Sequence, residues 1–166
     1  MTRGPRRAAV LAAVLALPLG CAAPSGAEPA ATARYSGGGV TVELRLDAAG
    51  AAARQLRATF TPQEPGFHLY SLDLPDGGVG GLGIPTRLAV RGVLAADGAP
   101  TADRPLRTVS PTALGVLLPV YPDGPVTITL PVRSTGPGQA EAVLSYGACS
   151  EQRCLVPVTA QAVALG

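Results

Sequence analysis

The fold of this chain is set by stretches such as VTVELRL, residues 40–46. Apolar Val and Leu side chains alternate there with Thr, Glu and Arg. Successive residues of a β-strand point to opposite faces of a sheet, so a period of two predicts a strand with one buried face. The stretch therefore predicts the first strand of a domain that we expect to run over residues 40–166.

Runs of the same kind recur along the chain, and segments rich in Gly, Pro and Asp separate them. These runs are QLRATF (55–60), FHLYSL (67–72), TRLAVRGVL (86–94), VTITLPV (126–132), AEAVLSY (140–146) and LVPVTAQAVAL (155–165). We find no capped stripe of apolar residues at helical spacing after the N-terminal region. Short strands with frequent turns are typical of an all-β, immunoglobulin-like β-sandwich, for which we expect about seven to nine strands.

The composition agrees with one turn-rich β domain. The chain has 166 residues, of which 21 are Gly, 17 are Pro and 47% are hydrophobic, which suits a single core. All 13 basic residues are Arg, and three of them stand in the first seven positions. Without that segment, ten Arg face eleven acidic residues. The small positive net charge of the whole chain therefore does not indicate a nucleic-acid-binding face, and we expect no nucleic-acid partner.

Residues 1–20 have the pattern of an export signal. Arginines near the start precede an apolar run that is too short to cross a bilayer as a helix. The sequence LGC ending at Cys21 resembles the lipobox of bacterial lipoproteins, although Pro18 stands where that motif usually has Leu. We expect lipidation of Cys21, a flexible tether over residues 21–39 and a location in the cell envelope, on the outer face of a membrane. Plain secretion is the alternative.

Two further cysteines flank a polar turn near the C-terminus. The turn between Cys149 and Cys154 joins two apolar runs, so we expect a hairpin that places the two cysteines opposite each other, within reach of a disulfide. A bond across so small a loop adds little stability. An exposed pair at a hairpin tip, in contrast, exchanges readily with other thiols. Arg153 favours the thiolate of Cys154, and Glu151 opposes it.

These residues alone leave three interpretations of the pair open: a redox site, a structural clip, and a soft-metal site. Two thiols and the single His68 do not make an ordinary closed zinc site without carboxylates. We therefore expect no metal and no cofactor.

The segment YGACSEQRCLVP (146–157) resembles the cysteine hairpin of the N-terminal periplasmic domain of the thiol:disulfide interchange protein DsbD. PGFHLYSL (65–72), followed by GIPTRL (83–88), is similar to an earlier part of that domain, and YPDGPVTITLPV (121–132) is similar to a later strand. The resemblance covers residues 38–166 and also implies an immunoglobulin-like fold.

The resemblance implies a function in thiol-disulfide exchange, as a component of a protein-disulfide reductase. It implies that Cys154 forms mixed disulfides with oxidised extracytoplasmic client proteins and that Cys149 resolves them. It also implies a thiol-disulfide electron donor in the membrane that reduces the pair again. The alternative is a binding or structural lipoprotein whose hairpin disulfide is inert.

Four residues are candidates to line the cysteine site. Tyr146 and Arg153 are close to the cysteines in the sequence. The cap loop of the DsbD family has no counterpart in residues 103–121, where Leu114 and Leu117 are apolar candidates to cover the cysteines.

Other features of the sequence give no catalytic motif. His68 alternates with apolar neighbours, and we expect it to face solvent or the rim of its strand. The Gly-rich run at 77–83 lacks the Lys-Ser/Thr ending of a phosphate loop. No serine stands in a nucleophile elbow. The sequence therefore gives no support to a nucleotide-binding or hydrolase function.

Overall fold

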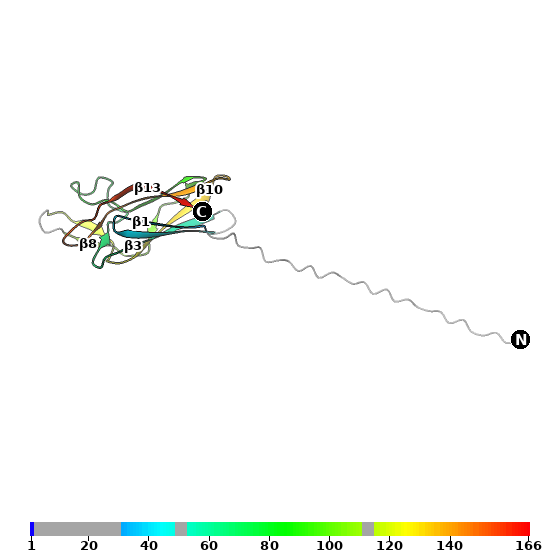
Figure 1. Ribbon diagram of the computed structural model, residues 1–166, viewed down its shortest axis with the longest axis horizontal. Coiled ribbons are helices and arrows are strands. Elements are labelled where there is room, and N and C mark those ends of the chain that lie inside the picture. Colours follow the sequence, from blue (N-terminus) through cyan, green and yellow to red (C-terminus); the bar gives the residue numbers. More distant parts are fainter. Residues whose placement is uncertain (2–30, 49–52, 111–114) are drawn as a thin grey trace.

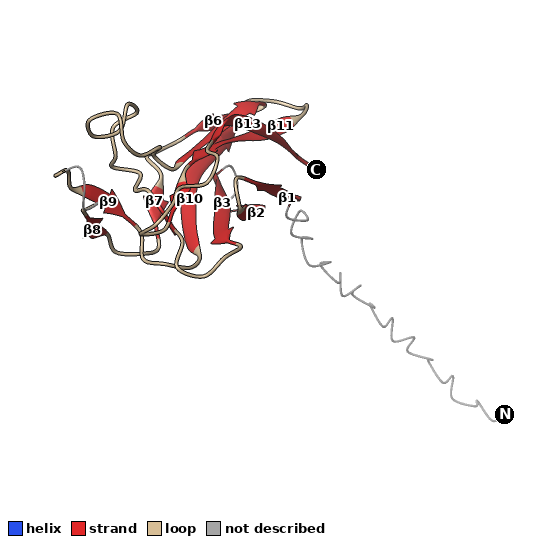
Figure 2. Cartoon of the chain, turned by 60° about the vertical axis from the view of Figure 1, so that its left-hand side comes forward, coloured by secondary structure: helices blue, strands red, loops and turns tan. Residues whose placement is uncertain are grey.

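The computed structural model describes Met1 and residues 31–48, 53–110 and 115–166 (Figure 1). The described residues do not include the predicted export signal after Met1. They also do not include Cys21 and Leu114. Within the described ranges every regular element is a strand (Figure 2), and nothing there forms an apolar helix of membrane-spanning length. The predicted fold class is confirmed: the chain is an all-β, immunoglobulin-like sandwich.

The first layer is an antiparallel sheet in the order β1-β2-β3-β10-β6, and β7 also pairs with β10. The strands are β1 (Ala31–Gly37), β2 (Val40–Ala48), β3 (Ala53–Pro62), β6 (Leu94–Ala96), β7 (Thr101–Ala102) and β10 (Val126–Ser134). Pairing places Phe60 of β3 opposite both Val42 of β2 and Val126 of β10. All three side chains are buried. The alternation in the sequence therefore builds the inner face of this layer.

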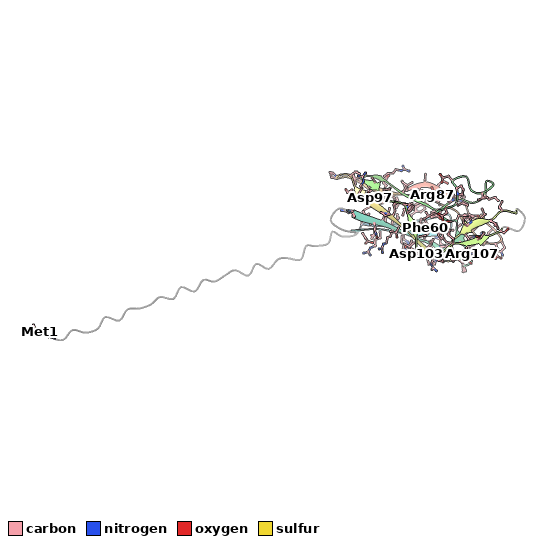
Figure 3. The ribbon with its side chains drawn as sticks, turned by 180° about the vertical axis from the view of Figure 1, so that it is seen from behind. Met1, Phe60, Arg87, Asp97, Asp103 and Arg107 are labelled. Atoms are coloured by element: carbon pink, nitrogen blue, oxygen red, sulfur yellow. A yellow bond between two sulfur atoms is a disulfide. The ribbon has the colours of Figure 1, made fainter. Side chains whose placement is uncertain are left out.

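The second layer contains β13 (Val158–Leu165), β11 (Ala140–Tyr146) and β5 (Arg87–Gly92), in that order across the sheet. Its buried side chains join those of the first layer in one hydrophobic core. The rings of Phe60 and Tyr146 meet edge to face, with their centroids 5.4 Å apart. Figure 3 places Phe60 near the middle of the sandwich.

Four short strands lie beside one another at one end of the sandwich. They are β4 (His68–Leu69), β12 (Ala148–Cys149), β8 (Arg107–Val109) and β9 (Leu118–Val120). β12 pairs with β4, β8 pairs with β9, and a bridge between Tyr70 and Val120 joins the two pairs. Figures 1 and 2 show β8 at the end away from the C-terminus. This end carries the two cysteines of the hairpin.

The structure corrects the predicted tether of residues 21–39. Strand β1 begins at Ala31 and pairs along its whole length with β2. The inward side chains of β1 are those of Ala31, Ala33 and Tyr35, which are only partly buried at the margin of the core. The Ala, Gly and Ser composition of the segment concealed this edge strand, because alanines give a weak apolar period. The folded domain thus starts before residue 40.

The described residues form more strands than the seven to nine that we predicted. Seven strands are at least six residues long, and the other six have two or three residues. A strand of two or three residues cannot display a period of two, so the sequence pattern did not reveal these elements. The run at 67–72 is such a case, because only His68–Leu69 of it forms a strand.

Candidate functional site

Cys149 and Cys154 form a disulfide, with their Cα atoms 4.0 Å apart. The hairpin that holds them is closed by the Ser150 N–H, which donates to the Arg153 carbonyl at 2.8 Å, and by the Leu155 N–H, which donates to the Ala148 carbonyl at 2.9 Å. The two cysteines also form an isolated antiparallel bridge. The predicted hairpin is therefore confirmed, and the backbone itself brings the two sulfurs together.

The two cysteines differ sharply in exposure. Cys149 is 5% exposed and belongs to a second apolar cluster with Tyr70, Leu118 and other residues. Cys154 is exposed on the outer side of the hairpin. A thiol or disulfide of another protein can therefore reach Cys154 but not Cys149 without a rearrangement, because exchange requires direct access to a sulfur.

A tyrosine hydroxyl contacts both sulfurs. The Tyr70 Oη lies 3.1 Å from the Cys149 Sγ and 4.0 Å from the Cys154 Sγ. Burial raises the pKa of Tyr70 above its usual value, so the hydroxyl keeps its proton and is available as a donor. Because Tyr70 and His68 lie two residues apart, they share the sheet face of Cys149, which pairs directly with His68.

Gly83 makes room for the Tyr70 ring, and Gly147 lies between this ring and Ile84. A Cβ on Gly83 would lie 3.0 Å from the Tyr70 Cε1, and one on Gly147 would lie 3.5 Å from the Tyr70 Cδ2 and 3.1 Å from the Ile84 Cβ. The Thr86 hydroxyl donates to the Tyr70 carbonyl at 2.6 Å. The ring is thus held between loops from two regions of the chain, with its hydroxyl at the sulfurs.

A pocket of about 640 Å³ opens beside the disulfide. One wall is the hairpin at 149–154, and the opposite wall is the segment at 107–110, which includes β8. His68 and Tyr70 lie between these walls. Cys154 lies in the wall of this pocket.

His68 forms a polar cluster with two charged side chains of this pocket region. Its Nδ1 lies 3.2 Å from a terminal nitrogen of Arg107 and 3.5 Å from the Asp123 Oδ1, and Arg107 also forms an ion pair with Asp123. Figure 3 shows Arg107 toward the end of the sandwich away from the N-terminus. His68 is only 4% exposed, which corrects the expectation that it faces solvent, and its ring contacts Arg107 and Asp123.

The pKa of His68 predicts a dependence of stability on pH. Burial and then the charge of Arg107 lower this pKa below 6.5, against the opposing effects of Asp123 and Glu151. On acidification the unfolded chain therefore takes up the proton first, and the stability due to neutral His68 is full above about pH 6.5 and falls below it. We expect the unfolding free energy to fall more steeply from about pH 6.5 to 5 in the native protein than in the H68Q variant. Denaturant titrations of both proteins measure this difference, and equal slopes would contradict it.

Arg153 lines the pocket, but its charge is already engaged. Its guanidinium lies 2.5 Å from the Glu64 carboxylate and 5.2 Å from the centroid of the Phe67 ring. These contacts fasten the cysteine hairpin to the segment before β4. Arg153 is thus an anchor of the hairpin as well as a neighbour of Cys154.

Two other predicted lining residues, Tyr146 and Leu117, lie elsewhere. Tyr146 is fully buried in the main core, where its hydroxyl donates to the Gly37 carbonyl at 2.8 Å. It does not line the cysteine pocket. Leu117 is 65% exposed and does not line the pocket either, and Leu114 lies outside the described residues. Among the described residues, the segment at 107–110 rather than Leu117 lines the pocket with the cysteines.

Sequence reasoning missed Tyr70, His68 and Arg107 as parts of the site. The alternation at 67–72 already placed residues 68 and 70 on one face, but it did not show that β12 pairs with this strand. No group of three or more His, Cys, Asp or Glu side chains suited to a metal ion occurs in the part of the chain that the structure describes.

No protein-family model matches the chain, and no curated protein matches its sequence. Among solved structures, the N-terminal periplasmic domain of ScsB from Proteus mirabilis matches with a TM-score of 0.56 and 14% identity. The match covers 82% of this chain and 51% of the other, so the chain spans about half the length of that structure. At this identity the likeness concerns the fold, and it agrees with the β-sandwich described above.

Two other solved structures match with TM-scores below 0.5. The N-terminal domain of DsbD from Neisseria meningitidis, in the reduced form, matches with a TM-score of 0.45 and 16% identity, over 77% of this chain and 91% of that one. The GAE domain of GGA2p from Saccharomyces cerevisiae matches with a TM-score of 0.41 and 6% identity, over 83% and 96%.

Proposed function

We propose that this protein is an extracytoplasmic carrier that exchanges disulfides with other exported proteins through Cys149 and Cys154. One observation carries the proposal: the disulfide joins a buried sulfur to an exposed sulfur at the edge of a pocket. An exposed disulfide at a hairpin tip is of the exchangeable kind. The sequence resemblance to the DsbD domain supports the same function, and the fold likeness to the ScsB domain agrees with the β-sandwich that this resemblance implies.

The exchange proceeds in two balanced steps. The Cys154 thiolate of the reduced protein attacks a disulfide of the oxidised client, which forms a mixed disulfide and releases one client thiolate. The Cys149 thiolate then attacks the Cys154 Sγ, which closes the Cys149–Cys154 bond and releases the second client thiolate. The client gains two electrons and the carrier loses two, and each released thiolate takes a proton from solvent.

Reduction of the carrier runs through the same exposed sulfur. A thiolate of the donor protein attacks the Cys154 Sγ, and the Cys149 thiolate departs toward Tyr70. The hydroxyl of Tyr70 is 3.1 Å from that sulfur and can donate to the developing negative charge. A second donor thiolate then breaks the mixed disulfide and leaves both cysteines reduced.

The N-terminal sequence sets the proposed location. The proposal includes export of the protein, directed by residues 1–20, and a lipid on Cys21 that anchors it to a membrane. The electron donor is a thiol-disulfide protein in the same membrane. The ScsB domain of similar fold is periplasmic, which supports an extracytoplasmic site of action. Mass spectrometry of the mature N-terminus tests the lipid on Cys21.

An inert structural clip is the competing interpretation. The hairpin is already closed by two backbone hydrogen bonds, and Arg153 fastens it to Glu64. A disulfide across a turn that is held in this way adds little stability. The arrangement therefore favours exchange over a clip.

The reduction potential of the cysteine pair tests the proposal. We expect a value well above about −300 mV, because a permanent structural bond lies below that level. In the native protein the Tyr70 hydroxyl can donate to the Cys149 thiolate and so stabilise the reduced form. The Y70F variant lacks this hydrogen bond, and we expect its reduction potential to be about 30 mV more negative. Equilibration with glutathione or dithiothreitol buffers measures both values.

A matched control is Y121F, because Tyr121 is also buried but its hydroxyl is bonded to the Leu72 N–H instead of to a sulfur. The potential of Y121F should equal that of the native protein. A native potential below about −300 mV would refute the carrier function.

A further inference from the structure

The His68 imidazole is held between two charged groups at its Nδ1 atom. A terminal nitrogen of Arg107 is 3.2 Å away, and the Asp123 Oδ1 is 3.5 Å away. Arg107 and Asp123 are also paired with each other. A guanidinium can only donate hydrogen bonds, so the contact with Arg107, which is shorter than the contact with Asp123, fits an Nδ1 that accepts. The neutral ring then carries its proton on Nε2.

The Nε2 atom is the free end of this arrangement. Among the described residues no group forms a hydrogen bond with it, and every fully buried side-chain nitrogen or oxygen in that part of the chain has a partner. The Nε2 is therefore not sealed from solvent. His68 lines two pockets, and one of them contains both cysteines. His68 thus borders the same pocket as the disulfide.

We propose that His68 is a docking residue whose Nε2–H donates a hydrogen bond to a main-chain carbonyl of the protein that reacts with Cys154. Arg107 acts as a positioning residue, since its contact with Nδ1 favours the tautomer that carries this proton, and Asp123 holds Arg107 through their ion pair. The inference rests on the proposed exchange function and adds a group that recognises the partner.

The chemistry of the partner favours a peptide carbonyl as the acceptor. A protein that brings a cysteine to Cys154 must also bring the polypeptide on either side of that cysteine into the pocket. Each of these residues carries a carbonyl, and a buried carbonyl without a donor is costly. The Nε2–H of His68 meets that need whatever side chains flank the cysteine of the partner.

Two disulfide probes distinguish recognition of a peptide backbone by His68 from the exchange reaction at the sulfurs. One is the disulfide-linked dimer of an acetylated and amidated pentapeptide with a central cysteine among alanines. The other is 2-hydroxyethyl disulfide, which has no peptide group. Each probe oxidises the reduced, untagged protein, and quenched alkylation measures the two rates. The ratio of the peptide rate to the small-disulfide rate then reports on peptide recognition.

We expect the H68L variant to lower this ratio about three- to tenfold, the usual effect of one lost hydrogen bond. The H68Q variant should restore it to within about twofold of the native value, because its amide N–H lies near the position of Nε2. An unchanged ratio in a folded H68L variant would overturn the inference and leave the exchange function intact. Failure of both probes to oxidise the native protein would overturn the function and the inference together.

The R107M variant and NMR provide a second test that does not rely on the folding of H68L. His68 is the only histidine of the chain, so nitrogen-15 labelling of histidine reports its tautomer without ambiguity. At pH 8 we expect the Nε2–H tautomer in the native protein. In R107M the Asp123 carboxylate should take the Nδ1–H instead, and the rate ratio should fall as in H68L. A native Nδ1–H tautomer, or an R107M variant that keeps the native ratio, would overturn the inference.

Discussion

A C149A variant should capture oxidised partner proteins on Cys154 and fail to release them, whereas a C154A variant should capture almost none. The reason is the difference in exposure between the two sulfurs: Cys154 is exposed, and Cys149 is 5% exposed beneath Tyr70. In C149A the first exchange step can occur, but no thiol remains to break the mixed disulfide. The effect on capture approaches all or none, because each substitution removes one of the two exchange steps completely.

Non-reducing gels of cell-envelope extracts show the captured species as bands that disappear on reduction. A defined probe makes the test quantitative: 5,5′-dithiobis(2-nitrobenzoate) should react with C149A at least about tenfold faster than with C154A, since access limits the rate at a buried thiol. Thermal unfolding of the two variants controls for their folding. Equal capture by both folded variants would contradict the assignment of Cys154 as the attacking sulfur.

The cysteine hairpin could be predicted because its geometry is local. Cys149 and Cys154 are five residues apart, and a polar turn between apolar runs brings such residues together in a hairpin whatever the rest of the fold does. The exposure of Cys154 follows from its place at the hairpin tip. The burial of Cys149 does not, because it depends on β4, which lies about eighty residues earlier in the chain.

The contact between Tyr70 and the sulfurs could not be predicted, since it requires the pairing of β12 with β4. The prediction that Tyr146 lines the cysteine site was wrong, and the positions of the residues in the sequence explain why. Tyr146 and Ala148 share one face and both enter the main core, whereas Cys149 turns to the second cluster. An odd separation within an extended segment places two side chains on opposite faces. Closeness in sequence misled the prediction, and the parity of the positions would have corrected it.

The F60A variant should lose about 3–5 kcal/mol of unfolding free energy, the usual cost of removing a fully buried phenyl ring. Phe60 is 0% exposed and lies in the row that crosses β2, β3 and β10. Its ring also meets that of Tyr146 in the second layer. The loss therefore combines the removed apolar surface, a cavity between the layers and a missing aromatic contact.

Denaturant titration of the oxidised protein measures this loss, so that the disulfide is the same in both proteins. L117A is the matched control, because Leu117 is a large apolar side chain that is 65% exposed, and its change should stay within about 0.5 kcal/mol. Tyr146 donates to the carbonyl of Gly37, the last residue of β1, so a collapse around Phe60 should also loosen β1. Hydrogen exchange should report faster opening of β1 in F60A than in L117A. A loss below about 1 kcal/mol in F60A would mean that the two sheets are not packed through this ring, and the sandwich that presents Cys154 would need another explanation.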